Sequence, residues 1–73
     1  MTRRLPAPWR EEKIAGGYIV RDASGLAIAH VYGRPMEADA MAAKQLTMDE
    51  ARRVAANIAR LPELLGRNIP DDE

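Results

Sequence analysis

The chain has 73 residues, 11 acidic and 11 basic side chains, a formal net charge of zero and no cysteine. A chain of this length forms one domain with a small core, and without cysteine it has neither a disulfide framework nor a thiolate metal site. The balanced charge argues against a strongly basic nucleic-acid-binding domain, and no apolar run suits a secretory signal or a membrane span. We therefore expect one cytoplasmic domain over 1–73, with disordered tails at 1–7 and 67–73.

Three strands are predicted in the first half of the chain, over 8–14, 17–22 and 26–33. The second and third are rich in branched and aromatic residues, and the DASG sequence between them fits a type I turn with Gly25 as a bulge. The Asp22 side chain can accept amide hydrogens inside this turn. The hairpin is expected to pair Val20 with Ile28.

The turn between the first two strands contains the sequence AGG. A two-residue loop would place Arg10 opposite Arg21, which is a repulsive pair, whereas a three-residue loop places Glu11 opposite Arg21, which is an attractive one. We therefore predict the three-residue loop.

Side chains alternate between the two faces of a strand, so this register sorts the sheet into two faces. One face carries Trp9, Ile19 and the alanines of the third strand. We expect the long helix to pack there, because a large indole beside small alanines fills the space below an alanine-rich helix. The other face is left open as a candidate interaction face, made of Tyr18, Val20, Ile28, His30 and Tyr32.

A short helix is predicted over 36–45, where Ala38, Met41 and Ala42 have helical spacing after Pro35. A helix this short is marginal unless it packs on something. The second face of the sheet is the surface that it could cover.

A long helix is predicted over 47–61. Thr47 and Glu50 have the spacing of a capping box, which places the start of the helix at Thr47. Its interior has one apolar stripe at helical spacing, made of Ala51, Val54, Ala55, Ile58 and Leu61, and we expect this face of the helix to be buried. The following PELL sequence is interpreted as a separate short turn that folds Leu64 and Leu65 back toward the core. The fold class is therefore α+β, a three-stranded antiparallel sheet with this helix packed on one face.

Two sequence motifs, VRDASGLAIAHVYGR and LTMDEARRVAANIARLPELL, follow a WR pair upstream. Together they resemble a family of small uncharacterised proteins common in alphaproteobacteria, especially rhizobia and their relatives. The similarity spans residues 9–65. It implies a bacterial, cytoplasmic protein, and it transfers no catalytic residue.

No catalytic, cofactor-binding or metal site is predicted, so we do not expect an enzyme. His30 is the single histidine and lies in the middle of a predicted strand, so a metal ion would lack its usual ligands. Ser24 is the single serine, and the turn explains it. Nucleophilic catalysis needs a positioned base and a group that orients it, and no such set is present.

The exposed side of the long helix carries a basic group that is an alternative phosphate-contacting site, made of Arg52, Arg53 and Arg60. Asp49 lies three and four residues before the first two of these arginines, so ion pairs within the helix account for much of the pattern.

Two functions remain open. The first is a protein-interaction module that self-associates as a homodimer through the open sheet face, since apolar surface on so small a domain usually meets a partner. The alternative is weak nucleic-acid binding, because three antiparallel strands followed by a helix resemble the DNA-binding domains of plant ethylene-response factors and the N-terminal domains of some tyrosine recombinases. Those domains use a basic sheet, whereas this sheet mixes Arg10 and Arg21 with Glu11 and Glu12.

Overall fold

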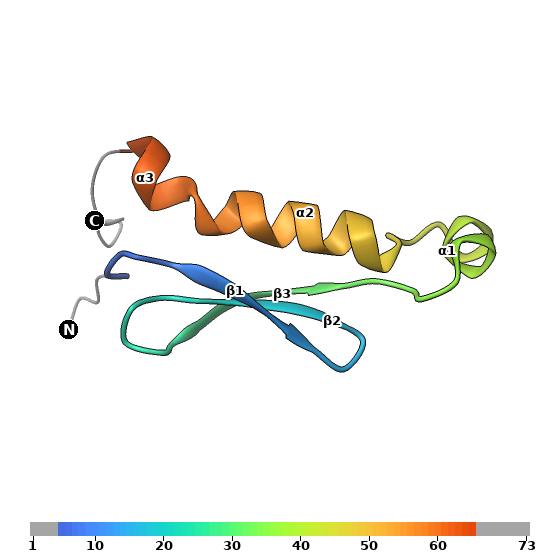
Figure 1. Ribbon diagram of the computed structural model, residues 1–73, viewed down its shortest axis with the longest axis horizontal. Coiled ribbons are helices and arrows are strands. Elements are labelled where there is room, and N and C mark those ends of the chain that lie inside the picture. The colour runs from blue at the N-terminus through green and yellow to red at the C-terminus, as the bar shows by residue number, and fades with distance from the viewer. Residues whose placement is uncertain (1–4, 66–73) are drawn as a thin grey trace.

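The computed structural model describes residues 5–65, in which a long helix lies across one face of a three-stranded sheet (Figure 1). The elements in chain order are β1 (Arg10–Ile14), β2 (Gly17–Arg21), β3 (Ala27–Tyr32), α1 (Glu37–Ala43), α2 (Met48–Ala59) and α3 (Leu61–Leu65). The strands are antiparallel in the order β1-β2-β3. The predicted α+β class and the three predicted strands are thereby confirmed.

The N-terminal segment is tied to the domain from Leu5 onward, although we predicted a tail over 1–7. The indole Nε1 of Trp9 donates to the carbonyl oxygen of Leu5 over 3.1 Å, and the amide of Ala23 donates to the carbonyl of Pro6 over 2.9 Å. The rest of both predicted tails lies outside the described residues.

The β1–β2 turn has two residues, so the three-residue loop was wrong. Ile14 pairs with Gly17, and Arg10 lies opposite Arg21. The repulsion between these arginines is offset diagonally, because the Nε of Arg21 lies 2.6 Å from Oε1 of Glu12. Gly16 has a φ of +81°, a conformation in the turn that glycine adopts at no steric cost.

The turn between β2 and β3 forms around Asp22, as predicted. The Oδ1 atom of its buried carboxylate accepts hydrogen bonds from the amides of Ser24 and Leu26, both over 2.9 Å, and Gly25 has a φ of +96°. A β-bulge at Val20/Arg21 shifts the register, so that Val20 lies opposite Ala29 and not Ile28 as predicted. An extra residue in one strand changes which side chains share a face.

The two-residue β1–β2 turn and the bulge between β2 and β3 together decide which side chains of β2 lie below α2. Val20 and Val31 are buried with Trp9 in one cluster that includes the underside of α2, and Tyr18 and Ile28 pack against the same cluster. We expected the helix to cover the face that carries Trp9, Ile19 and the alanines of β3. Trp9 and Ala29 do lie with α2, but the assignment of Ile19 was wrong, because Ile19 is buried outside that cluster and Val20 takes its place.

The helix α2 begins as predicted, with both hydrogen bonds of the capping box present. The amide of Glu50 donates to Oγ1 of Thr47 over 3.1 Å, and the amide of Thr47 donates to Oε1 of Glu50 over 2.9 Å. Ala51 and Ala55 are completely buried, so the helix axis lies close to the sheet. The capping box therefore fixes where the helix starts, and the two alanines fix how closely it packs.

The PELL segment is a separate helix, α3, but its leucines do not fold back. Leu64 and Leu65 are exposed, and Pro62 is the buried residue of α3. The interpretation of these leucines as core residues was wrong.

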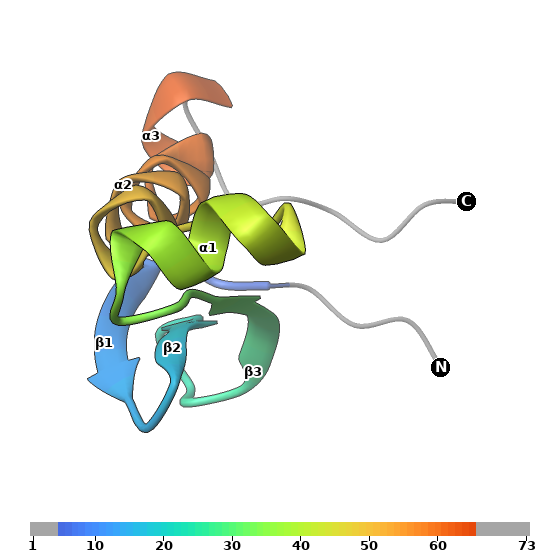
Figure 2. The same cartoon turned by 90° about the vertical axis from the view of Figure 1, so that its right-hand side faces the viewer.

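The predicted short helix is present as α1, but it lies beyond one end of the sheet and packs on no strand (Figures 1 and 2). It therefore does not cover the second sheet face. The segment that contains α1 begins and ends at the same place, because Arg34 is hydrogen-bonded to the chain just before α2. The amide of Arg34 donates to the carbonyl of Leu46 over 2.8 Å, and its carbonyl accepts from the amide of Met48 over 3.0 Å. Within residues 5–65, no helix has the length and apolar character that crossing a membrane requires.

Candidate interaction surface

The five residues predicted as an interaction face do not form one surface. Tyr18 and Ile28 pack against the core below α2, and Val20 is completely buried there. His30 and Tyr32 remain exposed on the other side of the sheet, where their rings stack with centroids 6.0 Å apart. The bulge separates these residues. It places Ala29 opposite Val20, so His30 and Tyr32, which were expected on the same face as Val20, lie on the opposite face.

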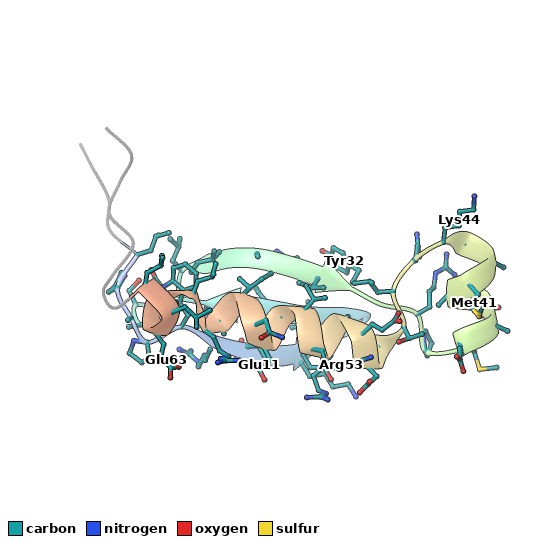
Figure 3. The ribbon with its side chains drawn as sticks, turned by 90° about the horizontal axis from the view of Figure 1, so that it is seen from above. Glu11, Tyr32, Met41, Lys44, Arg53 and Glu63 are labelled. Atoms are coloured by element: carbon teal, nitrogen blue, oxygen red, sulfur yellow. The ribbon has the colours of Figure 1, made fainter. Side chains whose placement is uncertain are left out.

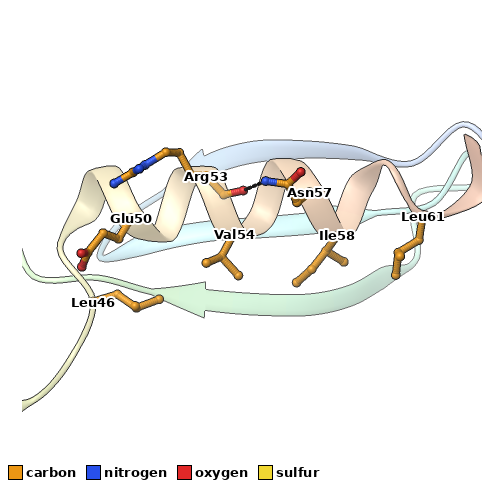
Figure 4. Close-up of a pocket in the computed structure, with 7 residues that line it drawn as sticks. All are labelled: Leu46, Glu50, Arg53, Val54, Asn57, Ile58 and Leu61. Carbon is orange, nitrogen blue, oxygen red and sulfur yellow. Dashed lines mark hydrogen bonds between the residues drawn. The ribbon is translucent and has the colours of Figure 1, made fainter. Parts of the chain in front are cut away.

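A different apolar surface is exposed along one side of α2, which we call the α2 flank and which consists of Leu46, Val54, Ile58 and Leu61 (Figure 4). Val54 is 41% exposed and Leu61 is 38% exposed, while Leu46 and Ile58 are half-buried. These side chains line a groove of about 630 Å³, and Glu50, Arg53 and Asn57 form its polar rim. In Figure 4 the apolar side chains point toward β3.

The position of the flank follows from helix geometry. Successive residues are about 100° apart around an α-helix, so Val54 points about 60° to one side of Ala51. The predicted stripe is therefore two surfaces: Ala51 and Ala55 contact the sheet, and the larger side chains overhang β3. The prediction that the whole stripe is buried was wrong for Val54 and Leu61. The separation of small from large residues within the stripe could have revealed this.

The two sides of α2 differ in character. Seen from above, charged side chains lie along the β1 side, where Glu11, Arg53 and Glu63 are labelled, and Tyr32 lies on the β3 side (Figure 3). The exposed apolar groups of α2 are thus concentrated on the side of one sheet edge.

The arginines predicted as phosphate contacts are held by neighbours within α2. Arg52 and Arg53 lie 3.3 Å and 3.2 Å from the two carboxylate oxygens of Asp49. A guanidinium nitrogen of Arg60 donates to Oδ1 of Asn57 over 3.4 Å. The three arginines are exposed, and two of them share one carboxylate, which lowers the positive potential that a phosphate would meet.

The polar groups of the turns serve the fold. The Oγ of Ser24 donates to Oδ1 of Asp22 over 2.7 Å. Burial raises the pKa of Asp22, but hydrogen bonds from Ser24, Leu26 and Gly25 outweigh it and hold that pKa below its usual value. A hydrogen bond from Arg21 lowers the pKa of Glu12. Within residues 5–65, no three histidine or carboxylate side chains are grouped closely enough to hold a metal ion.

No protein-family profile, curated protein sequence or solved structure matches this chain. The role of the α2 flank therefore has to be inferred from its own geometry.

Proposed function

We propose that this protein is a small self-associating interaction module whose binding surface is the α2 flank. The observation that carries the proposal is the exposure of Val54 and Leu61 beside the half-buried Leu46 and Ile58, in one groove on one side of the helix. Contiguous apolar surface of this kind on a small domain usually meets a partner.

The small core supports the same function. Among the described residues, the buried hydrophobic side chains larger than alanine are Trp9, Ile19, Val20 and Val31. A core of this size leaves a narrow margin of stability. Full burial of an exposed Val or Leu side chain contributes about 1.5–3 kcal/mol, so covering the flank would add stability that the isolated domain lacks.

The flank is a better candidate than the sheet face that the sequence suggested. On that open face, Arg21 and Glu12 form a half-exposed ion pair, and His30 on the same face is exposed. Groups of this kind are well hydrated, and burying them in an interface costs desolvation energy. The flank has apolar groups at its centre and polar groups at its rim, which is the usual arrangement of a protein interface.

Nucleic-acid binding is the weaker alternative. Asp49 lies against Arg52 and Arg53, so part of their charge is neutralised before any phosphate approaches. The net charge of the chain is zero, and nonspecific affinity for nucleic acid depends on uncompensated positive charge.

Sedimentation equilibrium over a range of protein concentrations tests the proposal. We expect the wild type to associate and Val54→Glu to remain monomeric, because a carboxylate is costly inside an apolar interface but is hydrated in the free monomer. Ala56→Glu is the matched control, since it adds the same charge to the same helix on the other side of the wheel.

Circular dichroism of both variants reports whether the helices are retained. A wild type that stays monomeric at millimolar concentration would overturn self-association. Equal loss of association in both glutamate variants, with both folded, would show that the flank is not the binding surface.

A further inference from the structure

We infer that the occupant of the α2 flank is a second copy of this chain, joined by antiparallel pairing of β3 with β3 about a two-fold axis. The two sheets then continue into one sheet of six strands, and the two α2 helices lie side by side on it. This inference depends on the proposed function, since both use the α2 flank, and it adds the sheet edge and the identity of the partner.

The two edges of the sheet differ in a way that favours β3. The edge strand β1 has the sequence REEKI, in which four of five residues are charged. The other edge strand, β3, has the sequence AIAHVY, with no proline and no Lys, Arg, Asp or Glu. Charged side chains and proline protect sheet edges from pairing with another chain. β1 is therefore protected, and β3 has the character of a strand that pairs.

The backbone of β3 offers hydrogen-bonding groups on its outer side. The amide of Gly33 donates to the carbonyl of Gly16, which places this pair at a hydrogen-bonded position of the β2–β3 ladder. Positions alternate along an antiparallel ladder. The backbone N–H and C=O groups of Val31 therefore point toward β2, whereas those of His30 and Tyr32 point to the outer side of the sheet. A second β3 strand in antiparallel orientation would satisfy these groups.

The spacing of the helices explains the size of the flank residues. α2 packs against all three strands of its sheet, with the most extensive contact to the middle strand β2. Across a β3–β3 join, the two β2 strands would be three strand spacings of about 4.8 Å apart, so the helices would be separated by about 14 Å. A helix with its side chains is only about 10–12 Å across. Large side chains are needed between such helices, and Val54, Ile58 and Leu61 occupy that side.

Charge also favours the antiparallel arrangement. Asp49 and Glu50 lie in the first turn of α2, and Arg60 lies at its C-terminal end. A two-fold axis near the middle of α2 would bring the acidic end of each helix to Arg60 of the other copy, and it would align the two helix dipoles in opposite directions, which is favourable.

The same two-fold axis would bring together exposed apolar side chains at the two ends of the domain. α1 and α3 lie at opposite ends of the domain (Figure 1). Both expose apolar side chains, with Met36 and Met41 in and beside α1 and Leu64 and Leu65 in α3. Antiparallel pairing of β3 brings α1 of each copy to the end of the other copy that carries α3.

His30→Pro tests the sheet pairing in sedimentation equilibrium. Proline removes an amide that points outward, while the hydrogen bonds between β2 and β3 remain, so the domain is expected to fold. We expect the dimer dissociation constant to rise at least about tenfold. Lys13→Pro is the control, because it introduces proline on the other edge strand, β1, at a position that alternates outward from the Ile14–Gly17 pair, and it should leave the dissociation constant within about threefold of the wild type.

Single-cysteine cross-linking gives a second measurement that does not require a weakened dimer. The chain has no native cysteine, so His30→Cys and Lys13→Cys each introduce one thiol, on β3 and on β1. Mild oxidation should form an intermolecular disulfide in His30→Cys well before Lys13→Cys, because a two-fold axis that passes through the β3–β3 pair at His30 places position 30 of one copy opposite position 30 of the other.

The outcomes separate this inference from the proposed function. Association that Val54→Glu abolishes, but that survives His30→Pro without preferential cross-linking at position 30, would overturn the β3 pairing and leave the flank as the binding surface. Association that survives Val54→Glu, with cross-linking at position 30, would overturn the flank and support the sheet edge alone. Preferential cross-linking at position 13 would overturn the inference directly.

Discussion

The Nε of Arg21 lies 2.6 Å from Oε1 of Glu12, which is on the neighbouring strand β1, two positions along from the residue directly opposite Arg21. That opposite residue is Arg10, whose guanidinium donates to the carbonyl oxygen of Asp22 over 3.5 Å. The diagonal pair permits two arginines to face each other across the first hairpin. It also provides the first testable consequence of the register.

Glu12→Gln should lower the free energy of unfolding slightly, because it removes the carboxylate that balances Arg21 and Arg10. The pair is half-exposed, so the loss should shrink in high salt. Urea unfolding at low and high NaCl measures it, with Glu11→Gln as the control on the other face of β1. A loss in Glu12→Gln that does not exceed that of Glu11→Gln, or that does not depend on salt, would contradict the role of the pair.

Two neighbouring residues of α2 should differ in how much a larger side chain lowers the free energy of unfolding. Ala55→Leu should cost about 1–3 kcal/mol, because the completely buried alanine has no space for a larger side chain. Val54→Leu should change the free energy of unfolding by less than about 0.5 kcal/mol, since Val54 is exposed. Urea unfolding at a low protein concentration measures both in the monomer. A large loss in Val54→Leu alone would place the flank in the core.

Gly33→Ala should destabilise the point where the chain leaves β3 and passes the start of α2. A Cβ at this position would lie 2.7 Å from the carbonyl oxygen of Thr47 and 2.9 Å from Cα of Met48, and neither backbone atom can move alone. We expect a cost of about 1–3 kcal/mol, seen as a lower Tm in thermal unfolding. An unchanged Tm would mean that this crossing is looser than described.

Stability should fall in acid through Asp22. Its pKa is held below the usual value by hydrogen bonds in the folded state. The stabilisation is therefore complete above the unfolded pKa of about 3.9 and is lost as the pH falls through the lower folded value. Urea midpoints at pH 7, 5 and 3 should decline more steeply in the wild type than in Asp22→Asn, which keeps an acceptor oxygen but does not titrate. Parallel declines would assign the acid sensitivity to other carboxylates.

Binding to mixed-sequence duplex DNA should be no tighter than about 10 μM at physiological salt, because the arginines of α2 are partly neutralised by Asp49. Fluorescence anisotropy over a salt series measures it. Submicromolar binding with a steep dependence on salt, lost when Arg52 and Arg53 are both changed to alanine, would make nucleic-acid binding the preferred function.

Local interactions determined much of this fold from the sequence. The capping box at Thr47 and the Asp22 turn are made by residues within four positions of each other, so their residue types and spacing were sufficient to predict them. The strands and helices were likewise found at their predicted places, because period-two and helical patterns reflect which residues are buried.

The tertiary structure decided the register, the covered face and the exposed part of α2. A bulge of one residue exchanges the faces of a strand, and the alternation of side chains is compatible with either arrangement. Likewise, the apolar stripe of α2 is wider than the strip that contacts the sheet, and only the position of the helix over β2 leaves Val54 and Leu61 uncovered. The candidate site lies at these residues because long-range packing, which residue spacing alone does not specify, determines which apolar side chains stay in contact with water.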